Sequence, residues 1–280
     1  MQSGDETGAA PSRRGRHRPL SVRGLRARGV QARRRSVETA AGRAHYVVAG
    51  SGPPMVLLHG LDGSSRWWTP TIHTLAPHYR CYALEFVTFD RWRDRGRVPL
   101  TRAGAFVAAW LEALDLDWAH VVAHSMGAFA ALSLALERPE RLGRLVLVAP
   151  ALLDRQQVSL HTLGESARLL PFIVSIAPGF LPVLVTDSLR TGPVRWLRSM
   201  HELSTAPLPP LDAVRAPTLL IWGTRDPLVP PSNGPILRGQ IAGSRLLYLP
   251  GARHVPMYER PLECNGAILR YLRGEEVGEP

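Results

Sequence analysis

The feature that most constrains the fold of this chain is a regular alternation of short apolar runs with longer segments of helical periodicity. The apolar, strand-like runs occupy residues 55–59, 80–86, 120–124, 144–149, 218–223 and 245–249. Helical patterns lie between most of these runs and after the last one, at about 66–77, 101–115, 127–138, 232–242 and 257–273. Such alternation is typical of a mostly parallel β-sheet that helices cover on both faces.

The chain has 280 residues, of which 45% are hydrophobic, and this is enough for one large core. Residues 36–40 and 44–49 flank a short turn and predict an antiparallel hairpin at the start of the sheet. Between residues 151 and 213 the alternation breaks, and an insertion of this length is usually functional. The expected parts are a disordered arginine-rich arm at 1–35, an α/β core at 36–150 and 214–273, the insertion at 151–213, and a C-terminal tail at 274–280.

The formal net charge of +11 is concentrated at the N-terminus. Residues 1–36 hold 10 arginines against two acids, whereas the remaining residues hold 24 arginines against 21 acids. The arm has no hydrophobic periodicity and no aromatic residues between its arginines, so we expect a solvated tail and no nucleic-acid partner. Arg13-Arg14 is not followed by an apolar stretch, which argues against a twin-arginine export signal. Lysine is absent, which suggests a GC-rich, bacterial genome.

Cys81 and Cys264 are the two cysteines of the chain. Two cysteines do not form a disulfide framework, so both are expected to be small buried residues of a cytoplasmic protein. The apolar stretch at 169–185 is interrupted by three prolines and a glycine, and a membrane span is therefore not predicted.

One candidate nucleophile lies where the apolar run at 120–124 meets the helical pattern at 127–138. Ser125 occupies this strand-to-helix junction, with the small residues Ala123 and Gly127 two positions before and after it. A tight turn of this kind exposes the serine hydroxyl, and small neighbours prevent clashes across the bend. The usual pattern is Gly-x-Ser-x-Gly, and here alanine replaces the first glycine. A serine before a helix can also be a simple N-cap, so the rest of the chain must decide.

Three other apolar runs end in residues that a serine nucleophile needs. The run at 55–59 leads into a glycine-rich loop that includes Gly60, and such a loop can turn a backbone N–H toward the serine. Asp226 follows the run at 218–223, and His254 follows the run at 245–249. Ligands bind at the carboxyl ends of parallel strands, where all these residues would emerge. The chain order is therefore Ser, Asp, His.

Taken together, these motifs resemble the α/β-hydrolase family over residues 36–273. The resemblance implies that Ser125 is the nucleophile, His254 the general base and acid, and Asp226 the acid that orients the imidazole. It also implies an oxyanion hole and a set of supporting motif residues. The oxyanion donors would be the N–H groups of Leu61 and Met126, and the supporting residues His59, Gly60, His124 and Gly127. The insertion at 151–213 would be a small helical cap over the site, and no cofactor or metal is expected.

Two details leave alternatives open. Asp154 is a rival acid, because some members of the family place the acid after the preceding strand, but Asp226 fits the Gly-x-x-Asp pattern better. Residues 86–97 replace a glycine-rich loop that relatives often carry, with Asp94 and Gly96 as its remnant. This loop adds bulk and charge at the rim of the site.

The expected function is hydrolysis of a carboxylic ester, thioester or lactone of an apolar small molecule through an acyl-enzyme. The cap is rich in apolar residues, which suits an acyl or aryl substrate. The same triad would serve a C–C bond hydrolase acting on a dienoic diketone, or a cofactor-free haloperoxidase or perhydrolase. A non-enzymatic ligand-binding protein that keeps the fold is the third alternative.

Overall fold

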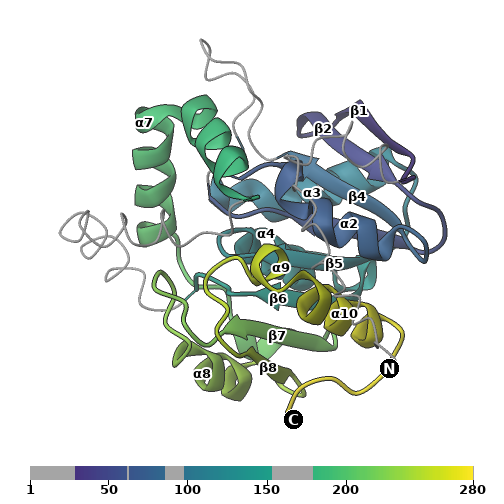
Figure 1. The fold of residues 1–280 in the computed structure, drawn as a ribbon. Coiled ribbons are helices and arrows are strands. Elements are labelled where there is room, and N and C mark those ends of the chain that lie inside the picture. Colours follow the sequence, from purple (N-terminus) through teal and green to yellow (C-terminus); the bar gives the residue numbers. More distant parts are fainter. Residues whose placement is uncertain (1–28, 62, 86–97, 153–178, 280) are drawn as a thin grey trace, which may run out of the picture.

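The computed structural model describes residues 29–61, 63–85, 98–152 and 179–279. Its centre is an eight-stranded sheet in the order β1-β2-β4-β3-β5-β6-β7-β8 (Figure 1). The strands are β1 Ala32–Thr39, β2 Gly42–Ala49, β3 Pro54–Leu58, β4 Arg80–Glu85, β5 Ala119–His124, β6 Leu142–Val148, β7 Thr218–Gly223 and β8 Arg245–Leu249. The first two strands form an antiparallel hairpin and β2 pairs antiparallel with β4, whereas β4, β3 and β5 to β8 run parallel. The predicted mostly parallel sheet is confirmed.

The hairpin starts earlier than the sequence indicates. Ala32 already pairs with Ala49, so residues 32–35, which the sequence assigns to the disordered arm, belong to β1. Arg33, Arg34 and Arg35 are exposed in this edge strand, and they give no alternation of apolar and polar residues from which a strand could be predicted. Residues 1–28 of the predicted arm lie outside the described residues.

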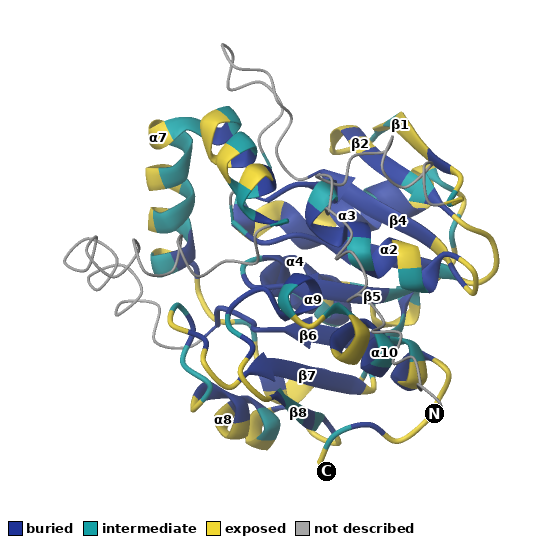
Figure 2. Ribbon diagram, in the orientation of Figure 1, coloured by how far each residue is buried: buried dark blue, intermediate teal, exposed yellow. Residues whose placement is uncertain are grey.

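Helices cover both faces of the sheet, as the alternation predicts. The helical segments are η1 Ser65–Trp68, α2 Thr69–Leu75, η2 Leu100–Arg102, α3 Ala103–Ala113, α4 Gly127–Glu137, η3 Pro139–Arg141, α7 Leu181–Thr205, η4 Leu211–Ala213, α8 Asn233–Gln240, α9 Pro256–Glu259 and α10 Pro261–Leu272. One buried cluster joins the sheet to α3, α4 and α8, and a second joins it to α2, α9 and α10. Successive strand residues alternate between them: Val121 lies in the first cluster and Val122 in the second. The central strands β3, β5, β6 and β7 are therefore buried on both sides, whereas the edge strand β1 is largely exposed (Figure 2).

The pattern predicted as a single helix at 257–273 is two helices that meet at Arg260. Arg260 has φ −130° and ψ 60°, which is not helical, and Pro261 begins α10. The residue before a proline is disfavoured in the α region, because the proline ring clashes with its backbone. The local sequence therefore contained the signal for this break.

Helix α7 belongs to the insertion and stands apart from the helices that cover the sheet (Figure 1). It bends at Gly192, which has φ +71°, and at Pro193, which has no N–H for the helical hydrogen bond. Of the predicted cap, residues 153–178 lie outside the described residues, and so do Asp154 and the loop at 86–97 with Asp94 and Gly96. None of the helices within the described ranges has the length and apolar character required to cross a membrane.

The segment after α10 packs against the last strand. Glu279 pairs antiparallel with Leu246 of β8, and both backbone hydrogen bonds of this bridge are formed, at 2.8 and 2.9 Å. The guanidinium of Arg245 donates to the carbonyl oxygens of Val277 and Gly278. Part of the predicted C-terminal tail is thus attached to the sheet.

Candidate active site

Ser125 occupies a strained turn between β5 and α4. Its φ is +52°, in the left-handed region that costs a residue with a Cβ roughly 1–2 kcal/mol. Hydrogen bonds on both sides hold this conformation: the Ser125 N–H donates to Val148 of β6 at 2.9 Å, and the Ser125 carbonyl accepts from Ala128 of α4 at 3.1 Å. Such strain is found where a fold must present one side chain, as the sequence motif predicts.

Two glycines let the neighbouring strand approach this turn closely. A Cβ on Gly127 would lie 2.6 Å from the carbonyl oxygen of Leu58 at the end of β3. A Cβ on Gly60 would lie 3.0 Å from Cβ of Ser125 and 2.9 Å from Nδ1 of His124. The sequence predicts that Gly127 is needed because it faces Ala123 across the bend, but its nearest contacts are to β3 instead. The glycine-rich loop and the serine turn therefore lie directly against each other.

His254 lies between Ser125 and Asp226. Its Nε2 is 3.1 Å from Oγ of Ser125, and its Nδ1 is 2.8 Å from Oδ2 of Asp226. The second oxygen of Asp226 accepts hydrogen bonds from the N–H groups of Leu228 and Val229, at 2.9 and 3.0 Å. In the neutral imidazole tautomer that donates from Nδ1 to Asp226, Nε2 is left as the acceptor toward the serine hydroxyl.

Backbone contacts hold the Asp226 loop and the His254 loop together. The Arg225 N–H donates to the Ala252 carbonyl at 2.9 Å, and the Thr224 N–H donates to the Leu249 carbonyl at 3.1 Å. Gly223, the last residue of β7, lies so close to the second loop that a Cβ there would be 2.2 Å from the Arg253 carbonyl oxygen. The relative position of the acid and the histidine is therefore fixed mainly by the main chain.

His124 contacts the backbone of His254, a contact that sequence reasoning did not identify. Nε2 of His124 donates to the carbonyl oxygen of His254 at 2.8 Å, and the two rings lie 4.8 Å apart. Burial, together with the nearby His254, lowers the pKa of His124 well below 6.5, so this imidazole stays neutral. The sequence placed His124 in the serine motif only as a turn or supporting residue.

Glu259 of α9 is a second residue that the sequence did not single out. Its carboxylate accepts hydrogen bonds from the N–H groups of Arg253 and Val255, which flank His254. Burial raises the pKa of Glu259, against the lowering effect of these two hydrogen bonds. Glu259 is four residues after the N-cap Val255, one position beyond the capping-box spacing, so no sequence signal pointed to it.

The two predicted oxyanion donors belong to the residue after Ser125 and to the residue after Gly60. Met126 is the first residue after it, at the start of α4, and Leu61 follows Gly60 in a turn closed by a hydrogen bond from Gly63 N–H to Gly60 carbonyl, at 3.2 Å. The same Gly60 carbonyl accepts a second hydrogen bond, from Nδ1 of His59 at 2.8 Å. In the ranges that the structure describes, no group of three or more His, Cys, Asp or Glu side chains could hold a metal ion.

Aromatic side chains connect the insertion to the histidine loop. Trp67 of η1 lies 5.6 Å from the ring of His124 and 5.0 Å from the ring of Phe180, just before α7. Phe180 in turn lies 4.7 Å from Tyr258 of α9. All three aromatic residues are buried, and Trp67 packs an aromatic ring against His124.

The model of the α/β-hydrolase family matches residues 55–267, and the chain therefore belongs to this family. The match to three curated relatives extends over nearly the whole length of each relative. The chain is 29% identical over 258 residues to a Mycobacterium tuberculosis protein named provisionally as the non-heme bromoperoxidase BpoC, covering 80% of this chain and 95% of that one. It is 28% identical over 267 residues to 2-hydroxy-6-oxo-6-phenylhexa-2,4-dienoate hydrolase of Comamonas testosteroni (82% and 91%). It is 28% identical over 246 residues to pimeloyl-[acyl-carrier protein] methyl ester esterase of Aeromonas hydrophila (76% and 92%).

Solved structures show the same fold. The carboxylesterase CesB of Bacillus subtilis superposes with a TM-score of 0.70 at 20% identity, covering 90% of this chain and 95% of that one. A hydrolase from Pseudomonas aeruginosa superposes with a TM-score of 0.70 at 25% identity, covering 85% and 98%. The activities named for these relatives and neighbours differ, but most of them are hydrolytic.

Proposed function

We propose that this chain is a serine hydrolase that cleaves a carboxylic ester of an apolar small molecule through an acyl-enzyme. The observation that carries the proposal is the position of His254, whose two ring nitrogens lie within hydrogen-bond distance of Ser125 and Asp226. A serine hydroxyl is a poor nucleophile until a base takes its proton, and a neutral imidazole is suited to this near neutral pH. The three residues follow the carboxyl ends of the parallel strands β5, β7 and β8, and β6 lies between β5 and β7.

The reaction would run in two halves. Nε2 of His254 takes the proton of Ser125 as Oγ attacks the ester carbonyl carbon, and the resulting oxyanion accepts hydrogen bonds from the N–H groups of Leu61 and Met126. When the tetrahedral intermediate collapses, the C–O bond to the alcohol breaks and His254 returns the proton to the departing oxygen. Water then attacks the acyl-enzyme with the same proton transfers, which releases the acid and restores Ser125. Each oxyanion donor typically contributes about 3–4 kcal/mol of transition-state stabilisation.

An apolar substrate is supported by the side chains near His254. Trp67 packs against the ring of His124, and Phe180 and Tyr258 continue this buried aromatic row toward the insertion. Small-molecule sites are mostly apolar with a few placed polar groups, and an aromatic row beside the histidines supports a substrate with an apolar part. The curated relatives include an esterase and a dienoate hydrolase, and both names are compatible with an acyl or aryl group beside a carbonyl.

Covalent labelling with an alkyl fluorophosphonate tests the nucleophile. We expect the probe to modify Ser125, and Ser125→Ala to abolish labelling and turnover while the thermal unfolding temperature stays near that of the unchanged protein. Ser133→Ala, in helix α4 behind the turn, is the matched control and should behave like the unchanged protein. Folded protein that is not labelled would instead support a ligand-binding molecule without turnover.

A turnover screen separates the alternative activities. p-Nitrophenyl esters of graded acyl length should be hydrolysed with a kcat/KM that rises from acetate to medium-chain acyl groups. A dienoic diketone measured beside them reports C–C bond hydrolysis, and bromide with hydrogen peroxide reports haloperoxidase activity. A higher kcat/KM for the diketone than for every ester would replace the ester assignment by C–C hydrolysis with the same residues.

A further inference from the structure

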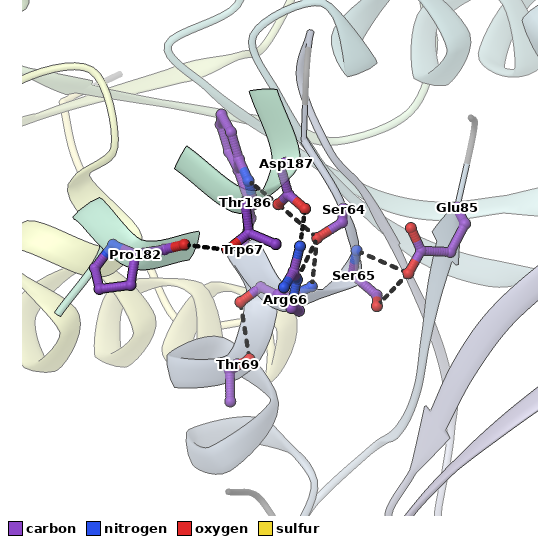
Figure 3. Close-up of polar contacts among 9 residues, drawn as sticks. All are labelled: Ser64, Ser65, Arg66, Trp67, Thr69, Glu85, Pro182, Thr186 and Asp187. Carbon is purple, nitrogen blue, oxygen red and sulfur yellow. Dashed lines mark hydrogen bonds and ion pairs between the residues drawn. The ribbon is translucent and has the colours of Figure 1, made fainter. Parts of the chain in front are cut away.

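A buried carboxylate of helix α7 binds the turn that follows the glycine-rich loop (Figure 3). Asp187 is fully buried, and its Oδ2 accepts hydrogen bonds from Oγ of Ser64 at 2.8 Å and from Nε1 of Trp67 at 3.0 Å. Its Oδ1 forms an ion pair with the guanidinium of Arg66, which also donates from Nε to Ser64 at 3.3 Å. We call Asp187 with Ser64, Arg66 and Trp67 the clasp. All three donors belong to η1 or to the residue before it.

A second buried carboxylate holds the same turn from the core. Glu85, the last residue of β4, accepts hydrogen bonds from Oγ of Ser65 at 2.5 Å and from its N–H at 3.3 Å (Figure 3). Glu85 belongs to the sheet, whereas Asp187 belongs to the insertion. Ser65 thus binds the start of η1 to the sheet, and its neighbours Ser64 and Arg66 bind it to the insertion.

The start of η1 is connected both to the turn that contains Leu61 and to the histidine that supports His254. Ser64 is the residue after Gly63, whose N–H closes the turn that contains Leu61. Trp67 contacts the ring of His124 at 5.6 Å, and His124 donates to the carbonyl of His254. A displacement of η1 would therefore move the Leu61 N–H on one side and the support of His254 on the other. An oxyanion donor must lie within a few tenths of an ångström of its place to be effective.

We propose that Asp187 is a positioning residue that couples helix α7 to the loop that carries the predicted oxyanion donor Leu61. The N–H of Leu61 then points at the substrate oxyanion only when α7 is held against η1 by the clasp. The inference rests on the proposed function for its catalytic consequence. Charge-assisted hydrogen bonds to a buried carboxylate are short and directional, and three of them from one turn leave that turn little freedom. The clasp links residues that are more than 100 positions apart in the sequence, so it reports the docking of the insertion and not the local folding of η1.

The test compares two variants of helix α7. Asp187→Asn keeps the size of the side chain but places an amide against Arg66, and it disrupts the clasp. Glu202→Gln is the matched control: Glu202, near the other end of α7, accepts from the N–H of Leu100 in η2 at 3.2 Å and thus also binds α7 to the core, away from the glycine-rich loop. For a medium-chain p-nitrophenyl ester, we expect Asp187→Asn to lower kcat about tenfold or more with KM changed less than threefold, as for a weakened oxyanion donor. The second-order rate of fluorophosphonate labelling should fall by the same factor, and Glu202→Gln should leave both within about twofold.

Hydrogen–deuterium exchange supplies a readout that does not need turnover. We expect faster exchange across residues 59–68 in Asp187→Asn, and no change there in Glu202→Gln. If Asp187→Asn does not fold, Ser64→Ala and Trp67→Phe each remove one donor of the clasp and should give the same pattern with a smaller drop in kcat. A rise in KM at unchanged kcat and labelling rate, or faster exchange confined to α7, would show that Asp187 merely fastens the insertion and would overturn the coupling.

The two proposals fail in different ways. If the unchanged protein neither turns over nor labels at Ser125, the proposed function is wrong, and exchange at 59–68 in Asp187→Asn still decides the coupling. If the unchanged protein is active and Asp187→Asn and Glu202→Gln lower kcat equally, the serine chemistry stands and the specific role of Asp187 is wrong.

Discussion

Nε2 of His124 donates a hydrogen bond to the backbone carbonyl oxygen of His254 at 2.8 Å, so the residue before Ser125 supports the residue that Ser125 contacts. Because the acceptor is a carbonyl, Nε2 must carry the proton. Nδ1 is then unprotonated, and it is buried beside Gly60, without a hydrogen-bond partner among the described residues. One imidazole therefore lies between the glycine-rich loop and the histidine loop.

Replacing His124 tests this support. His124→Phe leaves the buried carbonyl of His254 without a donor, which should lower the free energy of unfolding by roughly 1–3 kcal/mol. We expect kcat to fall about tenfold, since a shift of His254 worth about 1.4 kcal/mol in the transition state has that effect. His124→Gln, whose amide can donate to the same carbonyl, should recover most of both losses in chemical denaturation and ester turnover. Equal damage by Phe and Gln would contradict the role of the hydrogen bond.

The assignment of the acid is tested by two asparagine variants. Asp226→Asn keeps an oxygen for the N–H groups of Leu228 and Val229 but no longer selects the tautomer of His254, so kcat should fall by roughly 10⁴-fold. Asp154→Asn should change kcat less than about threefold. Folding is checked by circular dichroism in both cases. Greater damage at position 154 would move the acid to the rival residue.

Gly223 allows the Asp226 loop and the His254 loop to lie close together. A methyl group at position 223 tests whether activity depends on this close approach. Gly223→Ala would place Cβ 2.2 Å from the Arg253 carbonyl and 2.4 Å from the Ala252 carbonyl, so the His254 loop must shift. We expect at least a 100-fold loss of kcat/KM, because small displacements of reacting groups have effects of this order. Gly239→Ala makes the same change at an exposed position of α8 with nothing within 4 Å, and it should stabilise the helix by about 1 kcal/mol without loss of activity.

His120 predicts an acid-dependent loss of stability that is separate from the active site. Burial, with the charge of Arg144, lowers its pKa from 6.5 to about 4, and its Nδ1 accepts the N–H of Arg144 at 2.9 Å. Protonation of Nδ1 would place its new N–H directly against the backbone N–H of Arg144, so that two donors face each other. Because the folded pKa lies below the unfolded one, the contribution of neutral His120 is complete above pH 6.5 and is lost as the pH falls toward 4. Urea unfolding between pH 7 and 4.5 should show a shallower decline for His120→Asn than for the unchanged protein, whereas the exposed His78→Asn should follow the unchanged protein.

The sequence was sufficient for the fold because its signals are local and repeated. Alternating runs predict the parallel sheet, and four strand-end motifs predict which residues lie at its carboxyl edge. The structure places Ser125, His254 and Asp226 together at hydrogen-bond distances. Their roles in catalysis, like those of Leu61 and Met126, stay predictions.

Contacts between distant side chains could not be predicted in this way. Asp187 lies 123 residues from Ser64, and no composition or periodicity indicates that a helix of the insertion will bind the turn after the glycine-rich loop. The His124 contact is hidden for a related reason: its partner is a backbone carbonyl, which every residue has. The sequence placed the start of the first strand at residue 36 instead of 32, because three of its eight residues are exposed arginines that show no apolar alternation.

The pairing of Glu279 with Leu246 covers part of the outer edge of the last strand, β8, whereas the outer edge of the first strand, β1, carries exposed arginines. An uncovered strand edge is a template for pairing with another molecule, and here the chain's own final residues occupy part of that edge on β8. At the opposite edge, β1 presents Arg33 to Arg35, whose like charges repel a second copy of the strand. One edge is therefore protected by main-chain pairing and the other by charge. Removal of the contacts of residues 277–279 with β8 should promote self-association and leave ester turnover unchanged, while high salt should promote self-association through β1.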